Sequence, residues 1–202
     1  MSRGHLVLLG LLLVAVSTAL GVFVRDEAPA LDVRLNAYEP LHTRPLTVVA
    51  EWISFVLSPG LATIALLGLA VRSWLGKDFL VFRLGVLLGL CWATVLVRYA
   101  YRRVRPIDFP KWSYPSGHVT AVTALAFTAV VACAWYARRW VRTAAVLAVT
   151  AVALTAASRV VLSMHWFTDT AGAVSAVVGV GLLAGLALGL VRPGVISGRD
   201  RT

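Results

Sequence analysis

The stretches RYAYRRVRP at residues 98–106, PSGH at 115–118 and SRVVLSMHWFTD at 158–169 predict how this chain folds. Each stretch lies at the border of a long apolar run, so that fixed charges alternate with segments able to cross a membrane. Charged side chains near membrane depth are costly, and by default they indicate a functional site. The three stretches therefore predict membrane-spanning helices whose ends carry one polar site.

The composition indicates a membrane protein with several spans. Hydrophobic residues make up 59% of the 202 residues, and the mean hydropathy is +0.84, whereas a soluble domain is about 45–50% apolar. The net charge of +10 forms no basic patch interleaved with aromatic residues on a soluble domain, so we expect no nucleic-acid partner. Cys91 and Cys133 lie inside apolar runs and are predicted to be small buried hydrophobes.

Six apolar segments are long enough to cross a bilayer as helices. They predict an all-α, polytopic membrane protein with a single domain over residues 1–202, a kink at Ser58-Pro59-Gly60 in the second span, and a polar tail at residues 192–202. The first segment could instead be a signal peptide cleaved near residue 30, but its apolar core exceeds the usual length of about 7–15 residues. The predicted spans are residues 5–24, 46–71, 79–97, 118–137, 143–162 and 169–191.

The distribution of basic residues predicts the orientation. Six spans put both termini on one side, with ten Lys and Arg residues there and nine on the other side. Three of those nine are the arginines Arg98, Arg105 and Arg159, and without them the count is ten against six. Because basic residues favour the inner side, we expect cytoplasmic termini. The same topology places all three stretches at the external membrane face, although hydropathy alone defines the spans.

The first stretch offers two arginines for a phosphate. Arg98 and Arg105 are seven residues apart, close to two helical turns, so both can share one helical face. Guanidinium groups bind phosphate oxygens bidentately. The alternative is anchoring at the membrane interface, and this is the role that we expect for Arg102 and Arg103.

The second stretch begins an apolar helix with a small hydroxyl, a glycine and a histidine. The start of a helix presents free N–H groups to anions. Gly117 lets the backbone approach a ligand closely, Ser116 can cap the helix or donate to the ligand, and His118 can transfer a proton. The alternative is an ordinary helix cap followed by an unrelated histidine.

The third stretch pairs a histidine with a carboxylate. His165 and Asp169 are four residues apart, which makes them neighbours on one helical face. A carboxylate on a ring N–H fixes the tautomer and stabilises the cation. Arg159 lies six residues before His165, so a chain break near Ser163 or Met164 is needed to bring these two together. The alternative is a structural His–Asp pair.

Metal binding and serine catalysis are the competing chemistries. Two histidines and one aspartate could bind zinc, but three arginines would repel a cation, and Asp108 is the only spare carboxylate. We therefore expect an anion site with no metal and no cofactor. Ser116 lacks a following glycine at the spacing of a nucleophile elbow.

Together the three stretches resemble the signature of the type 2 phosphatidic acid phosphatase (PAP2) superfamily. These integral-membrane lipid phosphatases are related to vanadium haloperoxidases and bacterial acid phosphatases. Their pattern is Lys, six residues, Arg-Pro; then Pro-Ser-Gly-His; then Ser-Arg, five residues, His, three residues, Asp. The chain matches it over residues 98–169, except that Arg98 replaces the lysine, so that a planar fork replaces a point charge.

The resemblance implies a metal-independent phosphatase. His165 would attack phosphorus and form a phosphohistidine, Asp169 would orient His165, and His118 would protonate the leaving oxygen and then activate water. The groups expected to hold the phosphate oxygens are Arg98, Arg105, Ser116, Gly117 and Arg159.

The expected substrate is a phosphorylated lipid. The family analogy favours a polyprenyl diphosphate such as undecaprenyl diphosphate, with phosphatidate or phosphatidylglycerol phosphate as the alternative. A transporter or binder of phosphorylated lipids is the alternative of another class, but binding alone needs no His–Asp pair opposite a second histidine. A phosphotransferase stays open. Gly181, Gly185 and Gly189 form a stripe of small residues, which we expect to pack within a monomer.

Overall fold

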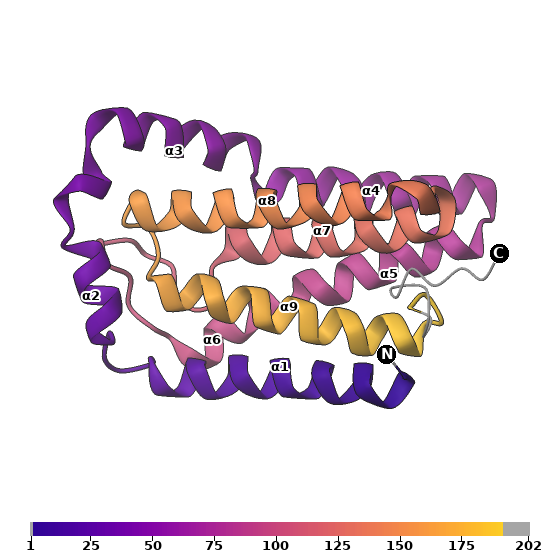
Figure 1. Cartoon of the computed structure of the whole chain (residues 1–202), viewed down its shortest axis with the longest axis horizontal. Coiled ribbons are helices and arrows are strands. Elements are labelled where there is room, and N and C mark those ends of the chain that lie inside the picture. The colour runs from indigo at the N-terminus through magenta and orange to yellow at the C-terminus, as the bar shows by residue number, and fades with distance from the viewer. Residues whose placement is uncertain (1, 192–202) are drawn as a thin grey trace.

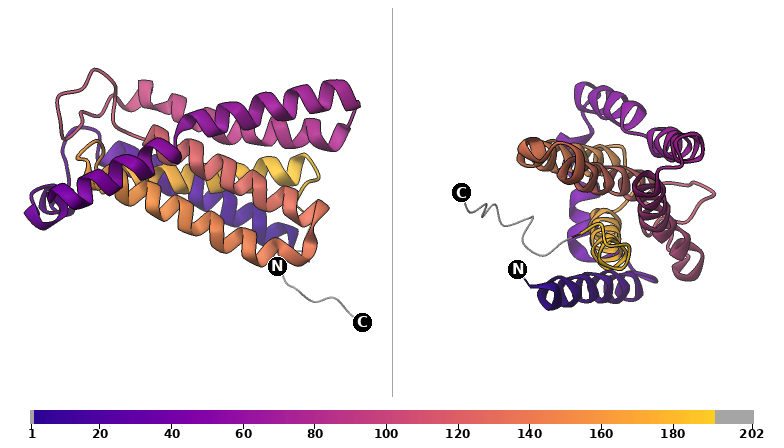
Figure 2. Two further views of the ribbon diagram at one scale, coloured as in Figure 1. Left: turned by 90° about the horizontal axis from the view of Figure 1, so that it is seen from above. Right: turned by 90° about the vertical axis from the view of Figure 1, so that its right-hand side faces the viewer.

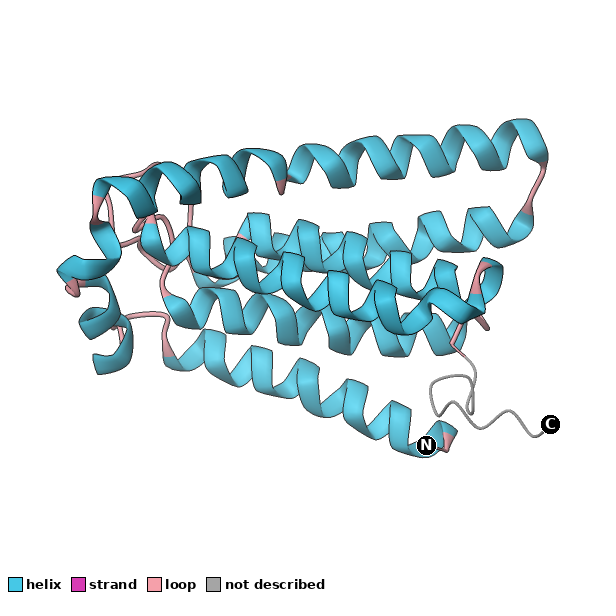
Figure 3. Cartoon of the chain, turned by 45° about the horizontal axis from the view of Figure 1, so that its top comes forward, coloured by secondary structure: helices cyan, strands magenta, loops and turns pink. Residues whose placement is uncertain are grey.

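The computed structural model describes residues 2–191, and this part of the chain contains helices and loops without any strand (Figure 3). Six helical segments are long and apolar enough to cross a membrane, which confirms the predicted all-α fold with six spans. The predicted polar tail at 192–202 lies outside the described residues. The six segments are α1 (Arg3–Phe23), α3 and α4 (Arg44–Val56 and Pro59–Gly76), α5 to α6 (Phe79–Ala93, η2 Thr94–Val97 and Arg98–Tyr101), α7 (Gly117–Tyr136), η3 with α8 (Arg138–Trp140 and Val141–Val161), and α9 (Phe167–Ala187).

Local capping explains where several helices begin. Ser2 precedes α1 and accepts the N–H of His5 at 3.3 Å. Asp78 precedes α5 and accepts the N–H of Leu80 at 2.9 Å, so that a side chain satisfies an otherwise free donor of the first turn. The predicted kink in the second span is a break between α3 and α4, where Pro59 occupies the first turn of α4.

The span α9 is the most enclosed of the six, and it lies between α1 on one side and α7 on the other (Figures 1 and 2). Its small residues allow this close packing. A Cβ on Gly179 would lie 2.9 Å from the carbonyl oxygen of Gly10 in α1, and one on Gly181 would lie 2.7 Å from the Phe127 ring in α7. The predicted glycine stripe therefore packs inside the chain at Gly181, while the oligomeric state stays a prediction.

The core of the bundle is apolar, as is much of its outer surface. The buried core includes Leu84, Leu87, Leu88 and Cys91 of α5 together with Ala124 of α7 and Val177 of α9. Cys91 is fully buried, as predicted, and Cys133 is half-buried. The outer faces expose many large apolar side chains, which is the pattern of helices that contact lipid.

The two ends of the bundle differ. The start of α1 and the end of α9 lie together at one end, whereas the long loops gather at the other (Figure 1). That second end also holds the short helices α2 (Ala30–Asn36) and η1 (Glu39–His42). The three stretches singled out in the sequence all border this second end.

Candidate functional site

The loop after α6 carries the first stretch away from its helix. Arg102 adopts a left-handed conformation with φ 53°, so the helix ends before Arg105. The prediction that Arg98 and Arg105 share a helical face is therefore wrong. Instead, Arg105 donates from Nε to the carbonyl oxygen of Lys111 at 2.6 Å and from Nη1 to that of Met164 at 2.8 Å. These bonds hold Arg105 against the third stretch.

The second stretch meets the first at the start of α7. The Nη2 group of Arg98 donates to the Pro115 carbonyl oxygen at 3.0 Å. A Cβ on Gly117 would lie 2.8 Å from the same Nη2, so a glycine is required for the guanidinium group to lie this close. Ser116 is fully buried, its N–H donates to the Asp169 carbonyl oxygen at 3.2 Å, and its Oγ has no partner among residues 2–191.

The third stretch turns sharply between α8 and α9. Ser163 has φ 51°, and the N–H of His165 donates to the Arg159 carbonyl oxygen at 3.2 Å, which confirms the predicted break. His165 precedes α9, so the prediction that it shares a helical face with Asp169 is wrong. The two still meet, because Asp169 reaches back to cap the helix start at the N–H of Trp166 (2.9 Å). Nδ1 of His165 lies 3.4 Å from Oδ2 of Asp169.

The sequence analysis did not assign two neighbours of Asp169 to the site. Ser113 is fully buried and donates from Oγ to Oδ2 of Asp169. Arg103 is 2% exposed and donates from Nη1 to Oδ1 of Asp169 at 2.6 Å. The prediction of interfacial anchoring is therefore wrong for Arg103. Arg102 is exposed, and among residues 2–191 its side chain donates only to the Tyr99 carbonyl oxygen. For Arg103, the one feature of the sequence that could have indicated a place in the site was its position two residues before Arg105.

Arg159 is held from a helix that the sequence did not connect to the site. Its Nη1 donates to Oγ of Ser54 in α3 at 2.6 Å, and its Nε is buried with no partner in the described part of the chain. The same is true of Nε of Arg98. Together with Oγ of Ser116, these groups are buried donors that a ligand oxygen could satisfy.

The second histidine completes the cluster. His118 lies half-buried in the first turn of α7, within electrostatic range of His165 and of three arginines. The structure thus brings together every residue that the sequence analysis assigned to the site, from the ends of four spans and the loops between them. These residues are Arg98, Arg105, Ser116, Gly117, His118, Arg159, His165 and Asp169.

Comparison with known proteins assigns the family. A family model described as the PAP2 superfamily matches residues 4–192. The chain belongs to the PAP2 superfamily. The membership predicted from the three stretches is confirmed. No curated protein matches this PAP2 protein in sequence.

A solved PAP2 structure has the same fold. The crystal structure of a transmembrane PAP2-type phosphatidylglycerolphosphate phosphatase from Bacillus subtilis superimposes with a TM-score of 0.66 at 17% sequence identity. The match covers 95% of this chain and 98% of that one. At this identity the likeness concerns the fold alone, so the roles of the site residues in this PAP2 protein stay predictions.

Burial and charge set the protonation of two site residues outside the spans. Burial lowers the pKa of His165 to about 4, against the opposing influence of Asp169. Burial, reinforced by the positive charge of Arg98, lowers the pKa of Arg105 to about 10. At neutral pH His165 is therefore neutral, as a nucleophile must be, and Arg105 keeps its positive charge.

The acidic residues of this PAP2 site are few. Among residues 2–191 no group of three or more His, Cys, Asp or Glu side chains could hold a metal ion. Asp108, the predicted spare carboxylate, is exposed, and the second carboxylate near the site is instead Asp32 of α2. Asp32 is engaged by Nη2 of Arg103 at 2.8 Å. The absence of a metal and of a cofactor stays a prediction.

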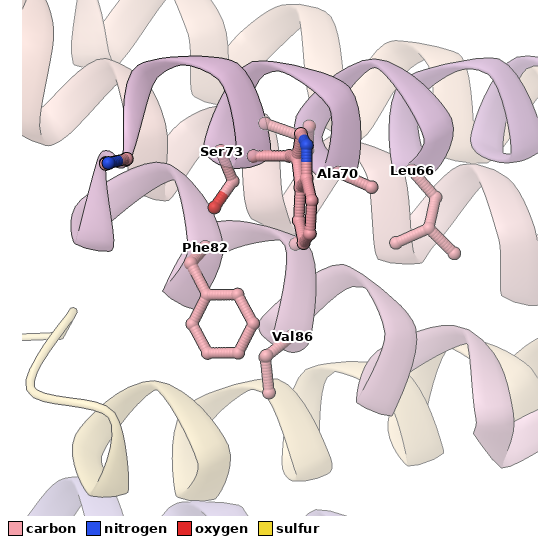
Figure 4. Close-up of a pocket in the computed structure, with 9 residues that line it drawn as sticks. Leu66, Ala70, Ser73, Phe82 and Val86 are labelled. Carbon is pink, nitrogen blue, oxygen red and sulfur yellow. The ribbon is translucent and has the colours of Figure 1, made fainter.

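Two apolar cavities differ in their relation to this site. The larger, of about 720 Å³, lies between α4 and α5 at the opposite end of the bundle, where Leu66, Ala70, Ser73, Phe82 and Val86 line it (Figure 4). It contains none of the motif residues. The other cavity, of about 620 Å³, is formed by α7, α8 and α9. Its lining includes Thr170, which directly follows Asp169, and Ala156, which lies one turn before Arg159.

Proposed function

We propose that this PAP2 protein hydrolyses a lipid phosphate or diphosphate through a phosphohistidine on His165. The arrangement that supports this proposal most strongly is the buried His165–Asp169 pair beside the half-buried His118, among three arginines. A binding site alone would need the arginines but not a histidine held in one tautomer by a carboxylate.

In the proposed first step, His165 attacks the phosphorus atom. Its Nδ1 faces Asp169, so Nε2 is the nitrogen that is free to form the N–P bond. As that bond forms, the P–O bond to the lipid breaks, and His118 gives a proton to the leaving oxygen. Asp169 stabilises the positive charge that grows on the His165 ring.

In the proposed second step, water releases the phosphate. His118, now neutral, takes a proton from a water molecule, whose oxygen bonds to phosphorus while the N–P bond breaks and His165 returns to its neutral form. Charge in such transition states is spread over the equatorial phosphate oxygens, and fixed donors there are effective. The donors that we assign to these oxygens are Arg98, Arg105 and Arg159, Oγ of Ser116 and the N–H of Gly117.

The groove between α7, α8 and α9 supports a lipid substrate. Ala156 in its lining precedes Arg159 by one turn, and Thr170 follows Asp169 directly. From Ala156 the lining continues along α8 to Ala145, a distance of about 16 Å at 1.5 Å per helical residue. A phosphate bound among the arginines would therefore leave its hydrocarbon chain beside an apolar channel in the bilayer.

Within this class we propose a polyprenyl diphosphate as the substrate, because it carries a single hydrocarbon chain and one of the two apolar cavities begins beside the site. The count of basic residues supports an external active site and cytoplasmic termini. The solved neighbour from Bacillus subtilis is a phosphatidylglycerolphosphate phosphatase, and this makes phosphatidylglycerol phosphate the second candidate.

The direct test is phosphate release by the purified protein from a panel of lipids in mixed micelles. The panel contains a polyprenyl diphosphate, phosphatidylglycerol phosphate, phosphatidate and the soluble ester p-nitrophenyl phosphate. We expect the first to have the highest kcat/KM and the His165→Ala variant to be inactive on all four. No release from any lipid would refute the proposal, and transfer to an added alcohol without free phosphate would indicate a phosphotransferase.

Filling the groove should separate lipid binding from chemistry. Ala153 lines the groove on α8, and its neighbour Leu154 lies outside it. Ala153→Phe should raise KM for the lipid about tenfold, because about 1.4 kcal/mol of chain contacts would be lost, and leave hydrolysis of p-nitrophenyl phosphate unchanged. Leu154→Phe is the matched control. Equal effects of the two variants would show that the chain lies elsewhere.

A further inference from the structure

The carboxylate of Asp169 divides its two oxygens between different partners. Oδ2 accepts from Ser113 and from the N–H of Trp166, and it lies 3.4 Å from Nδ1 of His165. Oδ1 accepts from Nη1 of Arg103 at 2.6 Å. Because the two oxygens are rigidly linked, the bond to Arg103 helps to fix the direction in which Oδ2 points.

Arg103 is itself held by a second buried carboxylate. Its Nη2 donates to Oδ2 of Asp32 at 2.8 Å, and its Nη1 also donates to Oγ1 of Thr168 at 2.7 Å. Oδ1 of Asp32 in turn accepts the N–H of Thr168 at 3.0 Å. The guanidinium carbon lies 5.6 Å from the centre of the Trp166 ring, so an aromatic face packs on the arginine.

These contacts exclude water and come from distant parts of the chain. Asp32 is 1% exposed, Arg103 is 2% exposed and Asp169 is fully buried. Asp32 lies in α2, 71 residues before Arg103 in sequence, and Arg103 lies 66 residues before Asp169. Buried charges persist only when they are paired with good geometry, and here one arginine bridges two carboxylates.

From this geometry we propose that Asp32 and Arg103 are positioning residues, which aim the Asp169 carboxylate at His165 and set how much negative charge it presents. The inference rests on the proposed function, in which His165 is the nucleophile. Among residues 2–191 neither side chain forms a hydrogen bond or ion pair with a proposed phosphate donor, so both act through Asp169. The net effect is that one positive charge is shared between two carboxylates, and Asp169 keeps charge enough to stabilise the His165 cation.

The charges around His165 predict opposite effects for the two partners. Besides Asp169, the groups that face His165 are Arg105 from the loop after α6, Arg159 from α8 and His118 from α7. In Asp32→Asn, Arg103 is no longer neutralised by its outer carboxylate and should lower the pKa of His165. In Arg103→Gln, Asp169 loses its positive partner, so the pKa of His165 should rise.

The experiment measures kcat, KM and the acid limb of kcat/KM for both variants. A charge-assisted hydrogen bond contributes about 1.5–3 kcal/mol, so kcat should fall about 10- to 150-fold in each, with KM changed less than twofold. The acid limb should move to lower pH in Asp32→Asn and to higher pH in Arg103→Gln. The double variant should restore the limb towards its original position, because it removes both charges.

Exposed residues nearby provide matched controls. Arg102→Gln changes the adjacent arginine, and Asp26→Asn changes a carboxylate in the loop before α2 whose side chain is 88% exposed; both should behave like the unaltered protein. Arg103→Lys keeps the charge but gathers its donors on one nitrogen, so it cannot reproduce the two separate nitrogens with which Arg103 reaches Asp169 and Asp32. It should lower kcat at least fivefold without moving the acid limb, and it guards against a misfolded glutamine variant.

A readout that needs no turnover separates the two proposals. The pKa of His165 can be followed by ¹⁵N NMR of the labelled histidine ring, with the signal assigned by its loss in His165→Ala. Shifts of opposite sign in Asp32→Asn and Arg103→Gln support the positioning role even if none of the lipids tested is hydrolysed. Equal or absent shifts, or kcat values matching the Arg102→Gln and Asp26→Asn controls, would overturn it while leaving the phosphatase proposal intact.

Discussion

Replacing Arg98 by alanine or by lysine separates its charge from the geometry of its guanidinium group. Nη2 gives one of its two N–H groups to the Pro115 carbonyl oxygen at 3.0 Å, and Nε is buried with no partner in residues 2–191. We assign Nε and the remaining N–H of Nη2, on the edge of the guanidinium plane that these two nitrogens share, to phosphate as a two-donor fork. At about 1.5–3 kcal/mol for each charged hydrogen bond, Arg98→Ala should lose about 3–6 kcal/mol of transition-state stabilisation, or about 10²- to 10⁴-fold in kcat/KM.

Lysine should recover part of this loss. Its ammonium group keeps the charge but donates from a single atom, so it cannot hold the Pro115 carbonyl and reproduce both arms of the fork. If one of two phosphate contacts is lost, Arg98→Lys should fall about 10- to 150-fold in kcat/KM. This residue stands where the PAP2 signature has lysine, so the result also shows whether this site has adapted to the fork.

The assay is the initial rate of phosphate release from the lipid in mixed micelles near pH 7, with Arg102→Ala as the control. Arg102 is exposed, and in the described part of the chain its side chain donates only to the Tyr99 carbonyl oxygen at 3.2 Å, so its loss should change the rate less than twofold. An Arg98→Ala rate within threefold of the unaltered protein would make Arg98 an interfacial anchor. An Arg98→Lys rate equal to that of the unaltered protein would refute the argument from the fork.

Three further predictions follow from the site and the topology. The lowered pKa of His165 keeps it neutral, so kcat/KM should stay level as pH falls and drop only near pH 4; an acid limb near the ordinary histidine value of about 6.5 would contradict this. Activity should survive exhaustive EDTA treatment and be inhibited by vanadate, and restoration of a lost activity by zinc or magnesium would refute the metal-free site. In a background lacking Cys91 and Cys133, an impermeant thiol reagent on intact cells should label Asp108→Cys but not Arg139→Cys, and the reverse would place the site in the cytoplasm.

The features that the sequence predicted correctly depend on short segments of chain. The length and hydropathy of an apolar run decide whether it can cross a bilayer, and that property is complete within each run. The break at Ser163 followed from the poor spacing between Arg159 and His165. The convergence of the three stretches followed from counting spans, because an odd or even number of crossings decides which loops share a side.

The prediction of shared helical faces failed for a local reason. Seven residues separate Arg98 from Arg105, and four separate His165 from Asp169, but the spacing alone does not show where the helix ends. The left-handed Arg102 interrupts the first pair, and the helix start at Trp166 divides the second. In both cases the residues still meet, because the loops fold back over the end of the bundle.

The partners of the charged groups could be found only in the tertiary structure. Arg102 and Arg103 are identical neighbours in one loop, yet the first is exposed and the second is buried between two carboxylates. Asp32 in α2 and Ser54 in α3 have no motif around them, and they reach the site because α2 and α3 cover its end of the bundle. The local sequence therefore does not distinguish an arginine that anchors at the membrane interface from one that forms a buried ion pair. The stability of a buried charge depends on its counter-charge, and here folding brings that counter-charge from residues 66 and 71 positions away.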